Sequence, residues 1–336
     1  MIKIDVAIPI FNEADSIKQC LESVIKLIVP ADTKLKIYVI DGGSSDNSRE
    51  IVNNLIINNQ NITLIHNAKK VAGAAMNMII NEGDGEYILR LDAGNIYDEE
   101  YLVNCYATSK KYNADNVGGV IETIAGSNTH GSKIVKYIMS HPFGVGNSTF
   151  RTGSVNEIKV DTVPFGFYKR KIFDKVGLFD ERLTRAQDFE LNGRIISSGG
   201  EIWLNPKIKC KYYSLSFWKF MKKNIFLDGP FNAYMWYLSP SSFSIRHSIT
   251  LFFAIGFFGG LVLSPFFSFI FYAYSSVLIL YFILSTMSSF QIAIKEKNYY
   301  VLVTLPSSFF IFHLLHGLGV LSGVINIILR RSPVQN

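Results

Sequence analysis

The stretch "IDVAIPIFNEADSIKQCLESVIKLI", residues 4–28, opens with a short apolar run, continues through a polar turn and ends in an amphipathic segment. The first part predicts a buried strand, and apolar residues spaced three and four apart in the last part predict a helix. The same alternation recurs along the chain, with further strands predicted at 36–41, 62–67 and 86–92. Strands that alternate with helices indicate parallel β-α-β units, so we expect an α/β fold built on an open, covered sheet.

Polar residues stand where three of these predicted strands end. Asn12 and Glu13 follow the first strand, Asp41 ends the second, and Asp92 ends the fourth. In open α/β sheets, ligands bind beyond the carboxyl ends of the strands. A single carboxylate at such a place is more often a turn or helix-capping residue, as we expect for Asp46. Several carboxylates that converge on one crevice indicate a binding site.

The distribution of charge changes near residue 245. Before that point charged and apolar residues are mixed, whereas residues 248–290 contain no Asp, Glu, Lys or Arg. A membrane span needs roughly 20 apolar residues, so this run predicts two spans, near 248–267 and 269–290. Another apolar tract covers 299–329 and is expected to be interrupted at Pro306.

We therefore expect two domains, a globular domain at 1–245 and a membrane domain at 246–331. The N-terminus lacks the features of a signal peptide, so the globular domain is expected in the cytoplasm. Basic residues flank the apolar tracts, and the positive-inside rule also places these flanks in the cytoplasm: Arg246, Lys295, Lys297, Arg330 and Arg331. An even number of crossings satisfies this rule, as two spans plus a hairpin or re-entrant tract around Pro306 would give. Three crossings with the last two arginines outside are the alternative.

The cysteines and the net charge indicate the compartment and the partners. Cys20, Cys105 and Cys210 are far apart and form no metal-binding spacing, which favours buried thiols in a reducing compartment. The formal net charge of +6 beside membrane spans fits anionic lipid headgroups, and no segment resembles a nucleic-acid-binding module. We therefore expect a membrane partner and no nucleic acid.

Two later segments contain further candidate residues. Residues 113–152 are rich in Gly, Asn, Ser and Thr, which predicts loops around short elements, and Arg151 among them is either an anion contact or an ordinary surface residue. The stretch "RAQDFELNGRIISSGG", residues 185–200, has helical spacing and carries Asp188 and Glu190 near its start. Carboxylates are favoured there by the helix dipole alone, so position by itself assigns them no role.

Five segments resemble, in the same order, the motifs of family 2 glycosyltransferases with the GT-A fold. They are "VAIPIFNEADSIKQCLESV", "VIDGGSSDNSREIV", the "DAG" at a strand end, "GLFDERL" and "QDFELNGRI". The resemblance covers about residues 4–215. The stretch "GVGNSTFRTG" and the tail "FHLLHGLGVLSGVI" are similar to the subgroup typified by the succinoglycan glucosyltransferase ExoA. This implies a GT-A catalytic domain followed by C-terminal transmembrane helices.

The resemblance implies a role for each matching residue. It implies a nucleotide pocket made by Pro9, Asn12, Glu13, Asp41, Gly73, Ala74 and Asn77, together with Asp92. Within this pocket Asp41 is expected to accept the imide N–H of uracil, which would select a UDP-sugar donor. Asp92 matches the first Asp of the "DxD" motif and is the implied metal residue. Asp188 matches the Asp of the "ED" motif and is the implied catalytic base.

The implied reaction is a single displacement at the anomeric carbon of the donor sugar. The acceptor hydroxyl is a weak nucleophile near neutral pH, so a general base, here Asp188, removes its proton as the bond forms. A divalent cation, Mg²⁺ or Mn²⁺, would stabilise the charge that develops on the leaving diphosphate. Attack from the far side of the sugar inverts the anomeric configuration.

The sequence departs from the family pattern at two positions. Gly94 stands where the second Asp of "DxD" binds metal, so Asp92 would reach the metal directly or through water, or hold the ribose instead, with Asn95 as a further oxygen donor. Gln187 stands where many members have Glu. In addition, no "QxxRW" motif follows Asp188, which favours transfer of a single sugar.

We expect an inverting glycosyltransferase that moves one sugar from a nucleotide sugar to a polyprenyl-linked saccharide in exopolysaccharide or capsule synthesis. Its expected location is the inner (plasma) membrane, as a multi-pass protein. One alternative with the same fold is a polyprenyl-phosphate glycosyltransferase. Another is a nucleotidyltransferase of a sugar-nucleotide pathway, although "PIFNEADS" has neither the Gly-rich loop nor the basic pair of that class. The last is a membrane protein that only binds a nucleotide sugar.

Overall fold

The computed structural model describes residues 1–243 and 245–331, without the side chains of Arg246 and His247. By its contacts the chain divides into two compact units. Unit 1 consists of Met1–Glu122 and Gly153–Tyr213, and unit 2 consists of Thr123–Thr152 and the residues from Ser214 onward. Part of the segment before residue 245 thus packs with the C-terminal helices, and a functional boundary at that residue stays a prediction.

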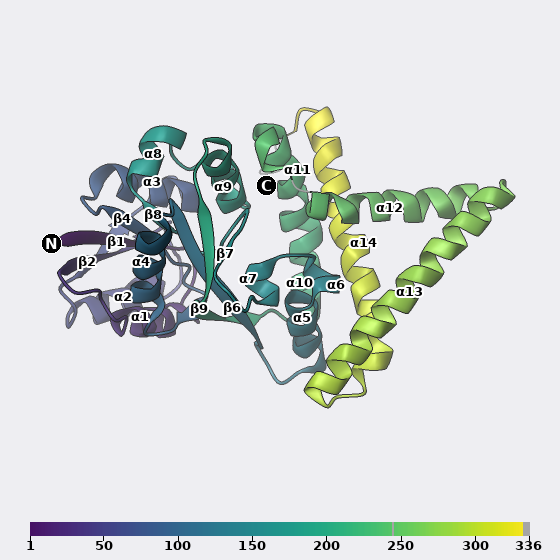
Figure 1. Cartoon of the computed structure of the whole chain (residues 1–336), viewed down its shortest axis with the longest axis horizontal. Helices are drawn as coiled ribbons and strands as arrows, with labels where there is room; N and C mark the ends of the chain where they lie inside the picture. Colours follow the sequence, from purple (N-terminus) through teal and green to yellow (C-terminus); the bar gives the residue numbers. More distant parts are fainter. Residues whose placement is uncertain (244, 332–336) are drawn as a thin grey trace. The chain divides into compact units, whose positions relative to one another are not determined.

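Unit 1 contains the four parallel strands that the sequence predicted. They are β1 (Ile2–Ile10), β2 (Thr33–Asp41), β3 (Ile62–His66) and β4 (Tyr87–Arg90). The helices that connect them are α1 (Ile17–Ile25), α2 (Ser48–Ile56) and α3 (Ala72–Glu82) (Figure 1). Ile4, Val6 and Ile8 on one face of β1 and Ala7 on the other are all buried, as expected for a parallel strand that is covered on both faces.

The other half of the sheet is built by antiparallel strands that pair over long separations in sequence. β8 (Phe167–Lys169) lies antiparallel between β4 and β6 (Asn116–Ala125). β9 (Ile202–Ser214) pairs antiparallel with β5 (Asn95–Tyr97) and β7 (Ile158–Lys159). The strand order is β3-β2-β1-β4-β8-β6-β9-β5, and three helices complete the unit: α4 (Tyr101–Tyr112), α8 (Lys171–Val176) and α9 (Gln187–Ser197).

The register of the parallel strands places their polar ends at one edge. Ile10 at the end of β1 lies opposite Asp41 at the end of β2. On the other side of β1, Ala7 lies opposite Arg90 at the end of β4. The residues that follow β1 and β4 therefore lie at the same edge as Asp41, where open α/β sheets bind ligands.

Unit 2 is helical. Its first segment forms α5 (His130–Ser140), α6 (Pro142–Val145) and α7 (Thr149–Thr152). Its second segment begins with α10 (Phe217–Lys223), a π-helical turn η1 (Asn224–Asp228), α11 (Gly229–Leu238) and the short η2 (Pro240–Ser242). It ends with α12 (Ile245–Leu263), α13 (Ser268–Glu296) and α14 (Val301–Ile328).

The last two helices are long and apolar enough that each could cross a membrane. The expectation that Pro306 interrupts the last apolar tract is wrong, because α14 continues through this residue. A proline removes one backbone donor, so only the carbonyl oxygen of Leu302, four residues before Pro306, loses its helical partner while the helix continues.

Candidate active site

The loops that follow β1 and β2 are bonded to each other. Asn12 adopts a left-handed backbone conformation (φ 54°), donates its backbone N–H to Ser44 Oγ at 2.9 Å and accepts the N–H of Ser45 at 2.8 Å. The next residue, Glu13, donates its backbone N–H to Ser48 Oγ at 2.8 Å. Asn is among the few residues that adopt this conformation readily, so the sequence itself favours the turn. The two loops form one rigid rim at the carboxyl edge of the sheet.

Two aspartates of the β2 loop differ in what they offer a ligand. Asp46 accepts the N–H groups of Ala14 and Ser48, each at 3.0 Å, which confirms the turn role expected for it. Asp41 is 1% exposed, and its Oδ1 accepts the N–H of Ser44 at 3.0 Å. Its Oδ2 accepts no hydrogen bond from the described residues, and the nearest cation, Arg49 Nε, lies 3.5 Å away. Buried carboxylate oxygens are normally satisfied, so Oδ2 can accept a donor from a bound molecule.

A buried arginine joins the two carboxylates that the motifs singled out. Arg90 at the end of β4 is 4% exposed, and its Nε and Nη2 each lie 3.2 Å from Oδ1 of Asp92. Its Nη1 donates to Oδ1 of Asp188, the second residue of α9. Sequence reasoning missed Arg90, although there was a signal: "EYILRLD" places a cation in an otherwise apolar strand. A buried arginine normally has an anionic partner, and here it has two.

The electrostatics of this cluster suit proton transfer. Burial raises the pKa of Asp188 to about 6, Arg90 opposes this rise, and the negative charge of Asp92 adds to it. Burial also raises the pKa of Glu13, which a hydrogen bond from Ser16 at 2.6 Å partly offsets, while the charge of Asp92 raises it further. A carboxyl group that titrates near 6 is ionised at neutral pH and still basic enough to accept a proton from an acceptor hydroxyl.

Helix α9 is anchored by a chain of buried amide groups. Asn192, one turn after Asp188, accepts a hydrogen bond from Asn116 of β6 at 2.8 Å. The side chain of Asn192 also donates to Thr162 Oγ1 at 2.8 Å. All three anchoring side chains are buried. These buried hydrogen bonds fix the orientation of α9 and so help to position Asp188 against Arg90.

The segment after Asp92 offers few ligands to a metal. Asn95 donates to the carbonyl oxygen of Asp92 at 3.3 Å, while its own Oδ1 is buried without a hydrogen bond from the described residues. A Cβ atom at Gly94 would meet nothing within 4 Å. No group of three or more His, Cys, Asp or Glu side chains within the described ranges could hold a metal ion. The oxygen donors present fit a hard divalent cation only if a bound diphosphate and water supply most of its ligands.

The predicted residues of α3 lie elsewhere. Asn77 accepts the backbone N–H of Phe179 at 2.9 Å, and its amide group donates to the oxygen of Phe179 at 3.0 Å and to Glu181 Oε1 at 3.1 Å. A Cβ atom at Gly73 would lie 3.4 Å from the carbonyl oxygen of Asp180. These contacts hold "GLFDERL" against α3. A direct role of Gly73 and Asn77 in nucleotide binding stays a prediction.

The structure thus groups some of the predicted residues and separates others. Asn12, Glu13 and Asp41 share the bonded rim, and Pro9 of β1 lies opposite Ile40 of β2 just before it. Asp92 and Asp188 share Arg90. Arg151, the candidate anion contact, belongs to unit 2. The three cysteines are buried, as predicted.

Comparisons with known proteins show which family the chain matches. The family model for glycosyl transferase family 2 matches residues 5–177, just over half of the chain. The succinoglycan biosynthesis protein ExoA of Rhizobium meliloti (strain 1021) is 28% identical over 210 residues, which cover 62% of this chain and 62% of that protein. A dolichyl N-acetyl-alpha-D-glucosaminyl phosphate 3-beta-D-2,3-diacetamido-2,3-dideoxy-beta-D-glucuronosyltransferase of Methanococcus voltae is 28% identical over 338 residues, covering 96% of this chain and 97% of the relative.

Solved structures share the fold. The mannosyltransferase PcManGT of Pyrobaculum calidifontis, in complex with GDP-Man and Mn²⁺, aligns with a TM-score of 0.61 at 14% identity, covering 93% of this chain and 86% of that one. TarS 1–349 of S. aureus aligns with a TM-score of 0.53 at 12% identity, covering 98% and 92%. These likenesses confirm the GT-A fold that the motifs implied. The chain belongs to glycosyl transferase family 2 and is a glycosyltransferase.

Proposed function

We propose that this glycosyltransferase transfers one sugar from a UDP-sugar to a lipid-linked saccharide, with inversion, in the synthesis of an exopolysaccharide or capsule. The observation that carries the proposal is the cluster of Asp92, Arg90 and Asp188 at the carboxyl edge of the sheet. In this cluster Asp188 has a pKa of about 6, so it is ionised at neutral pH. Asp92 stands at the place where the family binds the donor diphosphate.

In this proposal each residue of the site has one task. The unbonded Oδ2 of Asp41 accepts the imide N–H of uracil, because an N–H donor satisfies a buried oxygen that otherwise has none. Pro9, Asn12 and Glu13 shape the nucleotide pocket around it. Asp188 accepts the proton of the attacking hydroxyl group. Asp92, with Asn95 beside it, would hold a divalent cation, Mg²⁺ or Mn²⁺, which would neutralise charge on the leaving diphosphate.

The proposed acceptor follows from the relatives and from the apolar helices. The Methanococcus voltae relative, which aligns over nearly the whole chain, has a dolichyl-linked sugar phosphate in its name. Helices long and apolar enough to cross a membrane would keep the enzyme beside a lipid-linked substrate. We therefore place the enzyme in the inner (plasma) membrane as a multi-pass protein, with a catalytic domain over residues 1–245 in the cytoplasm.

A polyprenyl-phosphate glycosyltransferase is the second candidate. The undecaprenyl-phosphate 4-deoxy-4-formamido-L-arabinose transferase of Proteus mirabilis (strain HI4320) is 31% identical, but over only 32% of this chain. The shorter alignment makes this the weaker of the two.

The acceptor decides between the two candidates. Purified full-length protein in lipid would be supplied with labelled UDP-sugars and either a polyprenyl diphosphate-linked saccharide or bare polyprenyl phosphate. The proposal expects label in the linked saccharide only, and none with Asp188→Asn as the matched control. A stable product on bare polyprenyl phosphate would refute it in favour of the second candidate.

A further inference from the structure

The first half of α14 is covered by elements that precede the apolar tracts in sequence. Lys136 of α5 forms an ion pair of 3.1 Å with Glu296, which ends α13 just before α14 begins. His130 at the start of α5 shares a hydrogen bond of 2.9 Å with Thr304 of α14. Charged and polar side chains therefore meet α14 at its beginning.

The middle and the second half of α14 are covered by the continuous helical run α10-η1-α11. The ring of Phe220 stacks on Phe312 with centroids 5.3 Å apart. Further along, a Cβ atom at Gly319 would lie 2.7 Å from the carbonyl oxygen of Ile225, and one at Gly323 would lie 2.6 Å from a carbonyl oxygen of α11. These glycines allow close backbone contact, as small residues do at helix interfaces in membrane proteins.

The covering run carries charges beside the centre of α14. Lys222 and Lys223 lie between the contacts made by Phe220 and Ile225, and Lys223 forms an ion pair of 3.3 Å with Asp228 of η1. The facing residues 312–319 are the middle of α14. If α14 crossed a bilayer, its middle would lie near the midplane and these charges would lie at the most costly depth for a charged side chain.

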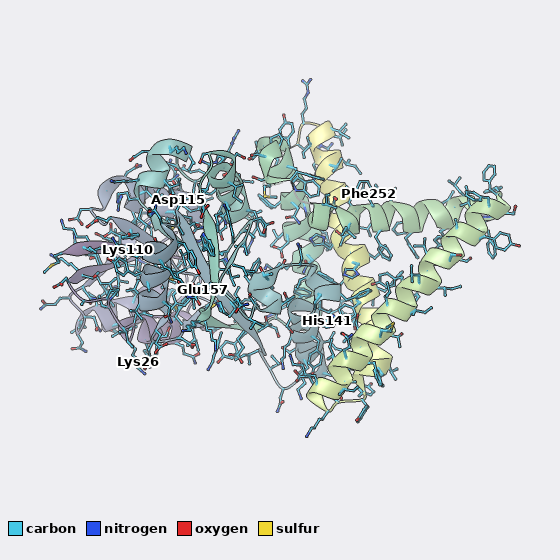
Figure 2. The ribbon with its side chains drawn as sticks, viewed as in Figure 1. Lys26, Lys110, Asp115, His141, Glu157 and Phe252 are labelled. Carbon is cyan, nitrogen blue, oxygen red and sulfur yellow. The ribbon has the colours of Figure 1, made fainter. Side chains whose placement is uncertain are left out.

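Helices α12 and α13 have the opposite character. They carry no Asp, Glu, Lys or Arg between residues 248 and 290, and large apolar side chains on them are exposed, such as Phe252 at 66% and Phe269 at 82%. Phe252 projects from α12 (Figure 2). At about 1.5 Å per residue, α12 is about 28 Å long, close to the hydrocarbon thickness of a bilayer.

The two helices form a hairpin that leaves α14 and returns to it. Thr250 near the start of α12 shares a hydrogen bond of 2.8 Å with His316, and Tyr281 of α13 shares one of 2.8 Å with His313. Figure 1 shows α12 leading away from α14 and α13 coming back. The two histidines thus join α14 to different helices of the hairpin.

We propose that unit 2 binds an anionic lipid bilayer with the α12–α13 hairpin inserted and α14 lying along the membrane surface. Helix length and mean hydropathy select α13 and α14 as candidate spans, whereas the charge-free stretch 248–290 covers α12 and α13. The charges beside the middle of α14 favour α12 and α13. Lys295 before α14 and Arg331 after it then lie on the same side of the membrane. Both are exposed, as basic residues in the headgroup region should be.

Cysteine labelling tests the sidedness. The native cysteines Cys20, Cys105 and Cys210 are buried, so a thiol introduced on the surface of the full-length protein is the main site of reaction. Single substitutions Lys219→Cys, Lys295→Cys and Arg331→Cys would be exposed to a membrane-impermeant maleimide in sealed vesicles of known orientation. All three are expected to react from the same side. Reaction of Arg331→Cys only from the side opposite to Lys295→Cys would overturn the proposal.

Depth measurements provide an independent test. Leu314 lies at the middle of α14 and the exposed Ile328 at its end, about 21 Å apart along the helix. Nitroxide labels on Leu314→Cys and Ile328→Cys are expected at the same depth in vesicles that contain anionic lipid. Labels on Phe269→Cys and Ile283→Cys of α13, about 21 Å apart, serve as the matched pair and are expected at different depths.

Either of two results would refute the proposal. The labels on α14 would differ in depth as much as those on α13 if α14 crossed the bilayer. The labels on α13 would share one depth if the hairpin were not inserted. Neither result depends on sugar transfer, so this proposal and the proposed function can fail separately.

Discussion

Replacing Arg90 is expected to move the pH dependence of sugar transfer. Asp188 acts as a base only when it is ionised, and its pKa of about 6 means that activity falls as the pH falls through 6. The guanidinium group of Arg90 favours the ionised carboxylate. In Arg90→Met that support is lost, so the pKa of Asp188 rises further and the acidic limb of the rate profile moves to higher pH.

The size of this shift follows from the geometry. Two unit charges about 4 Å apart interact by about 4 kcal/mol at an effective dielectric constant of about 20, which corresponds to about three pKa units. The Asp188 side chain is 24% exposed, so screening by water reduces this to about one or two units. The limb of Arg90→Met should therefore lie one to two units above that of the native enzyme. Arg90→Lys keeps the positive charge but loses the planar guanidinium group. The acidic limb of its rate profile should therefore stay close to that of the native enzyme.

The assay is the initial rate of transfer with saturating UDP-sugar, measured from about pH 5 to about pH 9. UDP affinity and thermal melting of each variant serve as controls, because Arg90 is buried and its loss also weakens packing. If both variants lose the same factor of kcat at every pH, Arg90 has only a structural role. That outcome would refute the reasoning that its charge tunes the base.

Four further outcomes are expected. Asp188→Asn should slow transfer by about 10²- to 10⁴-fold while the Kd for UDP changes little in calorimetry; persistent transfer would show that another group is the base. Asp41→Ala should raise the Kd for UDP about 10- to 100-fold, since it removes a charged acceptor, and an unchanged Kd would exclude the uracil contact. Asp92→Ala should abolish transfer. Gly94→Asp should melt at the same temperature as the native protein, because a Cβ atom at this position meets nothing within 4 Å. The Gly94→Asp variant should also need a lower Mn²⁺ or Mg²⁺ concentration for half of its maximal rate. Asn77→Ala should lower the free energy of unfolding by roughly 2 kcal/mol in denaturant titrations, since its buried amide bonds are lost; native stability with a raised KM would make Asn77 a binding residue instead.

The parallel half of the sheet and the carboxylates at its edge could be predicted because their signals are local. β1 to β4 appear as short apolar runs between helical periods, and a parallel sheet brings strand ends to one edge whatever its finer geometry. Asn12, Glu13, Asp41 and Asp92 are found in that way. The antiparallel half could not be read, because β5 has only three residues and pairs with β9 more than a hundred residues later.

The sequence by itself determined the α/β class, the carboxylates at the sheet edge and the charge-free stretch over residues 248–290, since each depends on the spacing of neighbouring residues. Only the tertiary structure decided that Arg90 joins Asp92 to Asp188, because Asp188 lies 98 positions away from Arg90 in sequence. The tertiary structure also placed Lys223 and Asp228 beside the middle of α14. The hydropathy of α14 alone does not show such neighbouring charges. Contacts between residues far apart in sequence depend on how the helices and strands pack together, and no local sequence pattern encodes that packing.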